Sequence, residues 1–596
     1  MRNAETVLAI IHERGKQGLP LEDIYRQLYN PHLYLRAYDR LRTNKGALTP
    51  GVTGETVDGM SMRRIQRIID AVRAERYRWT PAKRVYIPKK RTGKLRPLGL
   101  PSWSDKLLQD VMRQILEAYY EPQFSDHAHG FRPHRGCHTA LTAIKQRWSG
   151  TRWFVEGDIS QCFDKLDHDV LMVTLRARLH DNRFLRLVET MLAAGYLEDW
   201  RWHATYSGSP QGGVISPVLS NIYLDRLDTF VERRLLPCFN RGKKRAADST
   251  YQKVTYALGK ARKGGDGDLA RALVKRRRLL PAGAPNDPHF RRLTYVRYAD
   301  DFLLGFIGPR AEAEDIKARL RDFLRADLKL DLSEDKTLIT HATDDVAHFL
   351  GYDVRSNHAD DCLCPDGRRN VNGIIALRVP KDVVTRKCAA YMRGGKPIHR
   401  PELAHESDYS IMTRYQQEYR GVVQYYLLAH NVAALSYVCY TMHVSLLKTL
   451  ACKHRAKAVA MARRYRSTTE TEHGPLKCLK VVVPRDDGKK PLVAIFGGIP
   501  LRRKETATLR DTLPNVRFLT QQTDIVSRLL ADVCEICGHE TDCEVHHIRK
   551  LADLHKTGRR EKPLWMQRMI ALRRKTLVVC APCHRAIHHG KPLDRA

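Results

Sequence analysis

The sequence lacks any apolar run near the length of about 20 residues that a membrane-spanning helix needs. It also lacks a signal peptide, because no apolar core region of the right length follows Met1. We therefore expect a cytoplasmic protein that has no membrane partner.

Acidic residues are scarce relative to basic ones. The 596 residues include 66 Asp and Glu against 103 Lys and Arg, a formal net charge of +37. The excess is spread along the chain, which favours a long polyanionic partner, and nucleic acid is the default. Residues 241–278 alone carry thirteen basic and three acidic side chains. This segment predicts an exposed insertion that contacts phosphates, with a plain solvated helix as the alternative.

Cysteines are too scattered over the first 480 positions to indicate a disulfide framework, and Cys362 and Cys364 are interpreted as plain thiols. Near the C-terminus, by contrast, there are two C-x-x-C pairs. Four thiolates in this pattern predict a structural Zn²⁺ site, which a module of about 65 residues needs for stability. The predicted ligands are Cys534, Cys537, Cys580 and Cys583.

Asp300 and Asp301 lie between two apolar, β-rich segments, residues 293–296 and 302–306. These flanks predict two strands of a tight hairpin with the acids at its tip. Adjacent carboxylates near a core repel each other, and a divalent cation such as Mg²⁺ removes that penalty. Asp158 ends another apolar strand and is the natural third carboxylate of a two-metal site. For the acidic pair alone, the alternative is an ordinary solvated turn.

Two further segments are suited to a phosphate-bearing ligand. Residues 84–97 predict two strands joined by a basic glycine turn, which either holds a triphosphate or lies in solvent. Residues 207–213 predict a glycine turn before a helix, where glycine permits either close approach to a ligand or simply a tight turn.

Residues 376–475 predict a mainly helical region. Five positions at helical spacing mark one apolar, core-facing stripe: Tyr415, Tyr419, Val422, Val423 and Tyr426. The following helix, from about Leu435, becomes basic toward its end and is the part expected to touch RNA. Residues 468–475 read as a linker, and a short mixed basic segment follows at 476–530.

Histidines follow both cysteine pairs, His546 and His547 after the first and His584 and His588 after the second. A structural zinc ribbon does not need them, and the arrangement resembles the HNH (ββα-metal) nucleases. The resemblance implies that His547 is the general base and that His546 and His588 bind a catalytic Mg²⁺. The usual middle Asn falls at Thr576, which leaves one role unassigned. A zinc ribbon that binds nucleic acid without cleaving it is the alternative.

Taken in order, the motifs resemble the group II intron-encoded proteins, in which a reverse transcriptase, a maturase and a DNA endonuclease form one polypeptide. The resemblance runs nearly end to end. It rests on residues 87–101, 129–133, 156–159 with 162–164, 209–213, 298–301, 332–337, 349–352 and 420–426.

The resemblance implies a multidomain α+β fold. A right-hand polymerase with fingers and palm would be followed by an α-helical thumb or maturase domain and a small zinc-stabilised ββα-metal (HNH) domain. The implied boundaries are 1–375 for the reverse transcriptase with its N-terminal extension, 376–475 for the maturase, 476–530 for a DNA-binding or linker segment, and 531–596 for the nuclease.

The resemblance also implies roles for the polymerase residues. Asp158 and Asp300 would bind two Mg²⁺ ions, with Asp301 beside them. The other implied roles are Lys89 and Arg96 on the triphosphate, Phe163 under the sugar, Gln211 in the nucleotide pocket and Lys336 in support of the acids.

The implied partners are group II intron RNA in a lariat ribonucleoprotein, target DNA and deoxynucleoside triphosphates. The implied function is splicing assistance, target-strand nicking and reverse transcription primed from the nick. The oligomeric state stays open, with a homodimer as one option. Two alternatives remain: an RNA-binding splicing cofactor only, and a reverse transcriptase of another lineage fused to a nuclease.

Overall fold

The computed structural model describes residues 3–44, 46–88, 95–198, 201–203, 213–284, 287–359, 371–485, 490–505, 524–540, 542–551, 554 and 562–590. Among these residues, no helix is both long enough and apolar enough to cross a membrane. Lys89, Gln211, Cys362 and Cys364 fall outside the described residues.

The first eighty residues are mainly helical. Their helices pack around α4, an 18-residue helix whose start is capped by the Ser102 side chain and most of whose residues are buried. The elements are α1 (Ala4–Lys16), the 3₁₀ helix η1 (Ile24–Tyr29), α2 (Pro31–Leu41), β1 (Met60–Ser61), α3 (Met62–Arg73) and α4 (Trp103–Tyr120).

The predicted basic hairpin is present and belongs to a four-stranded sheet in the order β3-β2-β5-β6. Its strands are β2 (Ala82–Pro88), β3 (Leu95–Leu100), β5 (Tyr196–Glu198) and β6 (Arg201–His203). The turn between β2 and β3 lies outside the described residues.

A second four-stranded sheet, in the order β7-β8-β4-β9, occupies the position that the resemblance assigns to the palm. Its strands are β4 (Trp153–Asp158), β7 (Arg292–Tyr298), β8 (Asp301–Ile307) and β9 (Ile339–His341). The helices that accompany it are α5 (Cys137–Arg147), α6 (Cys162–Lys165), α7 (His168–Arg176), α8 (Asn182–Leu192), α9 (Ser216–Phe230), the π-helix η2 (Val231–Leu235), α10 (Leu236–Phe239) and α13 (Arg310–Leu328).

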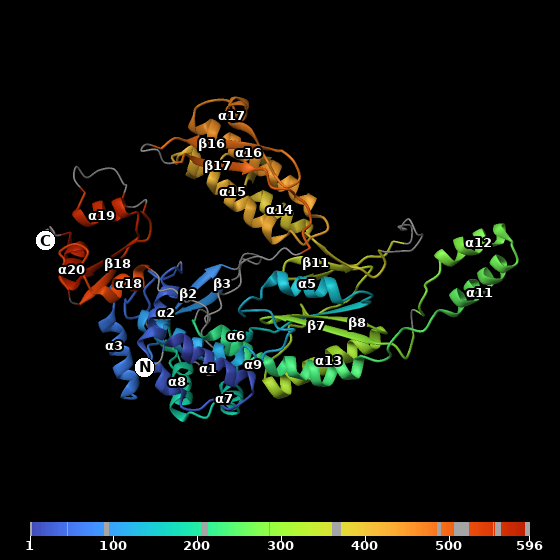
Figure 1. Cartoon of the computed structure of the whole chain (residues 1–596), viewed down its shortest axis with the longest axis horizontal. Helices are drawn as coiled ribbons and strands as arrows, with labels where there is room; N and C mark the ends of the chain where they lie inside the picture. The colour runs from blue at the N-terminus through green and yellow to red at the C-terminus, as the bar shows by residue number, and fades with distance from the viewer. Residues whose placement is uncertain are drawn as a thin grey trace.

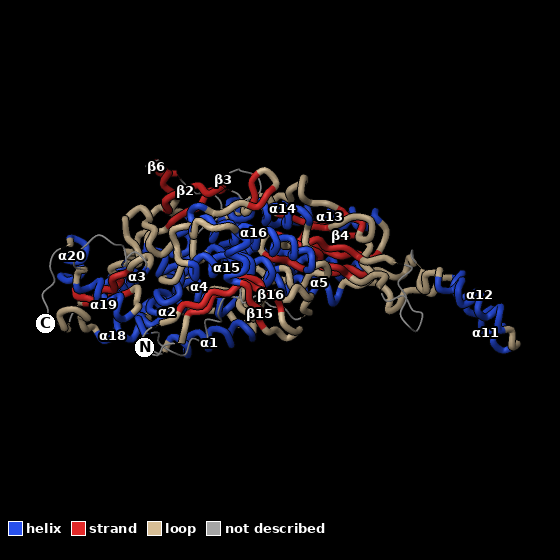
Figure 2. Tube along the Cα trace, turned by 90° about the horizontal axis from the view of Figure 1, so that it is seen from above, coloured by secondary structure: helices blue, strands red, loops and turns tan. Residues whose placement is uncertain are grey.

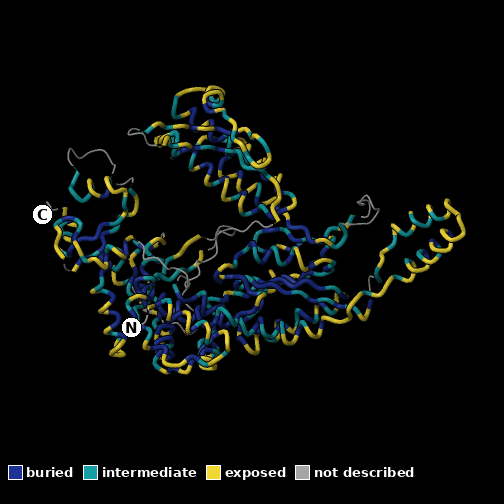
Figure 3. The backbone as a smooth tube through the Cα atoms, viewed as in Figure 1, coloured by how far each residue is buried: buried dark blue, intermediate teal, exposed yellow. Residues whose placement is uncertain are grey.

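The palm sheet separates two hydrophobic cores, because side chains alternate between its faces. Phe302, Leu304 and Phe306 of β8 face a core shared with the N-terminal helices. Leu303 and Phe154 face a core shared with the helices after residue 380. Figure 3 shows these strands mainly in the dark blue of buried residues.

Residues 241–278 form an exposed insertion, as predicted. It consists of two antiparallel helices, α11 (Ser249–Lys263) and α12 (Gly267–Arg278), and α12 buries none of its residues. In Figures 1 and 2 this helix pair projects away from the body of the molecule, and we call it the basic arm.

The region after the palm contains the predicted helices, which stand as a separate block in Figure 1. The expected core positions Tyr415, Tyr419 and Val423 are fully buried. The elements are β10 (Ala347–Phe349), β11 (Tyr352–Ser356), β12 (Ile375–Arg378), α14 (Lys381–Ala389), β13 (Met392–Arg393), β14 (Lys396–Pro397), η3 (Pro401–Leu403), α15 (Asp408–Tyr425), η4 (Val432–Leu435), α16 (Ser436–Lys453), α17 (Ala458–Tyr465), β15 (Arg466–Thr469), β16 (Leu476–Val483) and β17 (Leu492–Gly497).

Two details of this region differ from the sequence-based expectation. The expected single helix after Leu435 is divided into α16 and α17, because Arg455 adopts a left-handed conformation with φ of 49°. The expected linker at 468–475 is a hairpin connection, since β15 pairs with β16. β16 and β17 then bury Val481 and Phe496 in the core of the maturase helices, so these strands are not a free connection.

The C-terminal elements are α18 (Asp524–Ala531), β18 (Cys543–His547), α19 (Leu564–Leu572), β19 (Thr576–Cys580) and α20 (Ala581–His589). β18 and β19 form an antiparallel pair that leads into α20, and β1 extends this pair from the N-terminal region. The C-terminal module therefore lies beside α2 and α3, as Figure 1 shows.

Candidate active sites

The three predicted polymerase carboxylates lie together at one end of the palm sheet. β4 and β8 are antiparallel neighbours, and their register sets Asp158 directly opposite Asp301. Asp300 occupies the tip of the β7–β8 hairpin, after Ala299 with its φ of 57°. Strand pairing thus supplies the convergence that the sequence alone cannot show.

Burial and mutual repulsion make these carboxylates hard to ionise together. Burial, followed by the charges of Asp300 and Asp158, raises the pKa of Asp301 to about 7. Burial likewise raises the pKa of Asp300, while the positive charges of Arg96 and Lys336 oppose the rise. Acidic oxygen ligands that repel each other suit hard divalent cations such as Mg²⁺.

The hairpin tip is held by residues that the sequence reasoning missed. Arg297 is fully buried, and it donates to both carboxylate oxygens of Asp228, at 2.8 and 2.6 Å, and to the Ala299 carbonyl at 2.9 Å. Gly130 lies so close that a Cβ atom there would come within 2.3 Å of the Ala299 nitrogen. The sequence signal for this support was weak, because Arg297 and Asp228 lie on different elements.

Three of the remaining predicted polymerase residues can be placed. Lys336 Nζ donates to Asp158 Oδ2 at 2.7 Å, which agrees with its expected support of the acids. Arg96 lies on β3 and its charge acts on Asp300. Phe163 lies edge-on to Phe131, with ring centroids 6.2 Å apart.

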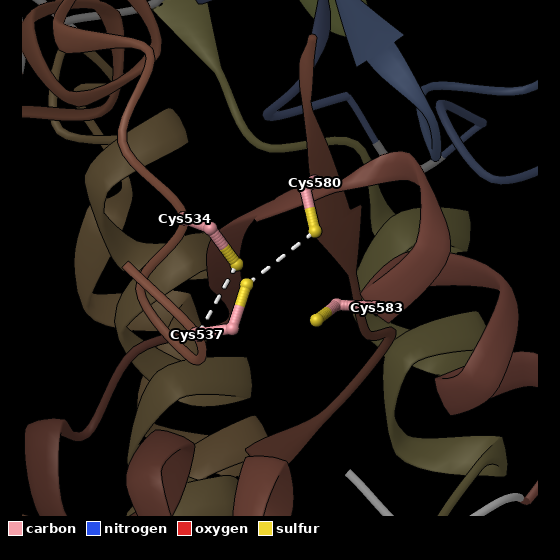
Figure 4. A group of neighbouring side chains, drawn as sticks. All are labelled: Cys534, Cys537, Cys580 and Cys583. Atoms are coloured by element: carbon pink, nitrogen blue, oxygen red, sulfur yellow. Dashed lines mark hydrogen bonds between the residues drawn. The ribbon is translucent and has the colours of Figure 1, made fainter. Parts of the chain in front are cut away.

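The four predicted zinc ligands, Cys534, Cys537, Cys580 and Cys583, come together in the C-terminal module. Their Sγ atoms all lie within 4.8 Å of one another. Figure 4 shows the four side chains pointing toward a common centre, with Cys537 Sγ 3.6 Å from Cys580 Sγ. Four thiols in this arrangement fit a closed tetrahedral Zn²⁺ site.

A second cluster in the same module unites predicted and unpredicted residues. The ligand atoms of His546 and His588, both expected to bind metal, lie within 4.8 Å of those of His584 and Asp58. His584 Nδ1 contacts Glu544 Oε2 at 2.7 Å. Burial opposes protonation of His584, but contacts with Asp58 and Glu544 outweigh it and raise its pKa to about 9. Sequence reasoning missed Asp58, which lies far from the histidines along the chain.

His547, the expected general base, points away from this cluster. Its Nε2 lies 2.9 Å from the Tyr38 hydroxyl of α2. Burial lowers the pKa of His547 to about 3, so its imidazole is neutral, as a general base must be. Thr576, at the usual middle Asn position, lies directly opposite His547 in the β18–β19 pair.

Comparison with known proteins assigns these regions to families. Residues 87–354 match the family model for reverse transcriptase (RNA-dependent DNA polymerase). Residues 376–466 match the type II intron maturase, and residues 534–584 match the AI2M/AI1M-like HNH endonuclease. The chain is also 36% identical over 587 residues to the group II intron-encoded protein LtrA of Lactococcus lactis subsp. cremoris, with 95% of each chain covered. The chain belongs to the group II intron-encoded proteins.

This group II intron-encoded protein therefore combines an RNA-directed DNA polymerase, a maturase and an HNH DNA endonuclease, which confirms the predicted function. The maturase match argues against a reverse transcriptase of another lineage. The chain is also 30% identical to the putative COX1/OXI3 intron 1 protein of Saccharomyces cerevisiae, over 94% of this chain and 68% of that protein. A solved telomerase from Candida albicans aligns with 63% of this chain and 62% of its own at 12% identity and a TM-score of 0.32, a similarity too low to inform the fold.

Proposed function

We propose that Asp158, Asp300 and Asp301 form the polymerase centre of this group II intron-encoded protein and bind two Mg²⁺ ions. The observation that carries the proposal is the register of β4 and β8, which sets Asp158 opposite Asp301 beside the hairpin tip. Two bound Mg²⁺ ions supply Lewis acidity for the attacking hydroxyl and for the departing pyrophosphate. The raised pKa of Asp301 fits this role, since a bound cation would keep both hairpin acids ionised.

The surrounding residues position the acids and the incoming nucleotide. Lys336 holds Asp158 through its 2.7 Å hydrogen bond, and Arg297 anchors the hairpin from beneath. Arg96 on β3 carries a positive charge toward the same end of the sheet, where a nucleoside triphosphate needs a cationic partner. We also propose that the triphosphate contacts Lys89, that the sugar lies over Phe163, and that the nucleotide pocket includes Gln211.

In the maturase region, we propose that the basic end of α16 and the helix α17 contact intron RNA. Lys448, Lys457, Arg463 and Arg464 are exposed there, while Tyr415 and Tyr419 of α15 are buried in the core. Binding energy from such a basic surface is sufficient for a protein that stabilises a folded RNA.

In the C-terminal module, we propose that the four cysteines hold a structural Zn²⁺ and that His547 is the general base for nicking target DNA. The nick would give the primer that the polymerase extends with deoxynucleotides. The neutral state of His547 supports the assignment. The cytoplasmic location and a homodimer remain predictions.

Two variants test whether the polymerase and nuclease centres are separate. Asp300→Ala should abolish cDNA synthesis on an RNA template with a preannealed primer, yet leave target-strand nicking intact. His547→Ala should abolish nicking and leave primer extension intact, because the two sites lie in different modules. Primer extension and nicking of labelled DNA measure both reactions on each variant.

Asp322→Ala, an exposed change on α13, is the control and should leave both reactions unchanged. Equal cDNA yield from wild type and Asp300→Ala would refute the polymerase assignment. Loss of both reactions in His547→Ala would mean that this histidine is structural.

A further inference from the structure

Three imidazoles of the nuclease module and one carboxylate lie around a common point. The carboxylate, Asp58, comes from the segment before β1, in the N-terminal region rather than in the module. Asp58 Oδ2 lies 2.8 Å from His588 Nε2 and 3.4 Å from His584 Nε2. Asp58 Oδ1 lies 3.4 Å from His546 Nδ1. His584 and His588 lie four residues apart on α20, so they share one face of the helix.

An independent observation indicates that a ligand belongs at this point. His546 is buried, with 5% of its surface exposed; its Nε2 has no hydrogen-bond partner among the described residues, and its Nδ1 contacts Asp58 Oδ1 at 3.4 Å without hydrogen-bond geometry. Buried polar atoms without a partner are destabilising, so native structures rarely contain them without a bound ion or water. His584 Nε2 and His588 Nε2 are also only 3.2 Å apart and face the same point.

The donor set selects a class of cation. Three imidazole nitrogens and one carboxylate suit Zn²⁺, Co²⁺ or Mn²⁺ better than Mg²⁺, which prefers oxygen ligands and retains its waters. Glu544 contacts the outer nitrogen of His584 at 2.7 Å and so directs the inner one toward the cluster. Carboxylates behind ligating histidines commonly have this orienting role.

Several contacts hold Asp58 in place against the module. β1 pairs with β18, Gly59 N donates to the Val545 carbonyl at 3.0 Å, and His547 N donates to Asp58 Oδ1 at 2.7 Å. Gly59 has a φ of 72°, a conformation that side-chain-bearing residues rarely adopt. Arg63 of α3 and Asp542 form an ion pair across the same interface. Asp58 therefore reaches the histidines only when the module is docked on the N-terminal helices.

We infer that Asp58 is a ligand of the nuclease metal, completing a site with His546, His584 and His588 that neither region forms alone. The inference rests on the proposed nuclease function. It adds that metal occupancy depends on docking of the module, so that the nuclease centre is built from both ends of the chain.

Cobalt binding to the full-length, zinc-loaded protein tests this inference. Co²⁺ held by histidines in low coordination absorbs visible light strongly, whereas Co²⁺ in an all-oxygen site absorbs weakly. Displacement of Zn²⁺ from the cysteines would be recognised by a separate thiolate charge-transfer band. Asp58→Asn should weaken Co²⁺ binding at the histidine site by at least about tenfold, since loss even of an outer-shell partner commonly has that effect.

Asp542→Asn is the matched control, because it removes a carboxylate from the same interface but not from the site. It should change the Co²⁺ affinity less than twofold. Unchanged affinity in Asp58→Asn would overturn the inference, and so would an equal loss in both variants, which would indicate docking rather than ligation. If His546→Ala keeps the visible Co²⁺ absorption band, the proposed histidine site of the nuclease is wrong. That conclusion would not depend on the Co²⁺ affinity of Asp58→Asn.

Discussion

Arg297 and Asp228 form a fully buried ion pair beneath the polymerase acids. Two hydrogen bonds join the guanidinium to the carboxylate, and the Tyr295 hydroxyl donates to the same carboxylate at 2.8 Å. Buried charges are tolerated when they are paired and hydrogen-bonded in this way. The pair fixes the hairpin tip, since Arg297 also donates to the Ala299 carbonyl.

Asp225, one turn before Asp228 on α9, should make the stability of the polymerase region depend on pH. Burial and the charge of Asp228 raise the pKa of Asp225 from 3.8 to about 7. The folded state therefore keeps a proton that the unfolded state loses, and the stabilising contribution present below pH 3.8 is lost as pH rises toward 7. Asp225→Asn, which mimics the protonated acid, should unfold at a higher temperature than wild type at pH 7, with little difference near pH 4.

The advantage of Asp225→Asn should approach about 4 kcal/mol at pH 7, because the rise from 3.8 to about 7 spans about three pKa units and one unit corresponds to about 1.4 kcal/mol. Thermal unfolding of both proteins at intervals from pH 4 to 8 measures it. Asp268→Asn removes a solvated carboxylate from the basic arm, 91% exposed, and is the control. A constant difference between Asp225→Asn and wild type across this range would contradict the assignment.

At the scale of single elements, features that depend on neighbouring residues could be predicted from the sequence. Contacts between segments that are distant along the chain could not. The β7–β8 hairpin follows from apolar flanks around two acids, a signal contained within about fifteen residues. The clustering of the four cysteines follows from their spacing in the same way. Asp58 could not be predicted, because the pairing of β1 with β18 joins opposite ends of the chain. Residues 468–475 were predicted to be a linker, although they connect β15 and β16 of a hairpin. Their polar residues are common both in linkers and in hairpin turns.

The basic arm is an element whose charge can be changed without disturbing a core. α12 buries no residue and ends in Lys275, Arg276, Arg277 and Arg278. Replacing the three arginines with Gln should leave thermal stability unchanged and weaken RNA binding, mainly at low salt. The slope of log affinity against log salt should become shallower by about 0.7 for each lost phosphate contact to single-stranded RNA.

Filter binding of the intron RNA at several salt concentrations measures this slope. Replacing Arg310, Arg319 and Arg321 with Gln removes an equal charge from the exposed face of α13 and is the matched control. If both triple variants change the slope equally, the basic arm has no particular contact with RNA and acts only through net charge.

One hydrophobic core joins the N-terminal region, the palm and the C-terminal module. Val545 and Leu529 of the C-terminal module share this core with Leu35 of α2 and Ile65 of α3. The maturase helices belong to the other core, on the opposite face of the palm sheet. Disturbance of the C-terminal module should therefore reach the N-terminal helices before it reaches the maturase.

Removal of the proposed structural zinc tests this coupling. A small zinc module draws much of its folding free energy from the metal, so Cys580→Ser should bind less zinc and unfold the module. We expect faster amide hydrogen exchange in α2 and α3 as well, because their apolar contacts with the module are lost, and unchanged exchange in α15 and α16. Cys478→Ser, at a buried thiol of β16 in the maturase region, is the matched control and should retain full zinc content. Unchanged protection of α2 and α3 in zinc-free Cys580→Ser would mean that the N-terminal helices are stable without the nuclease module.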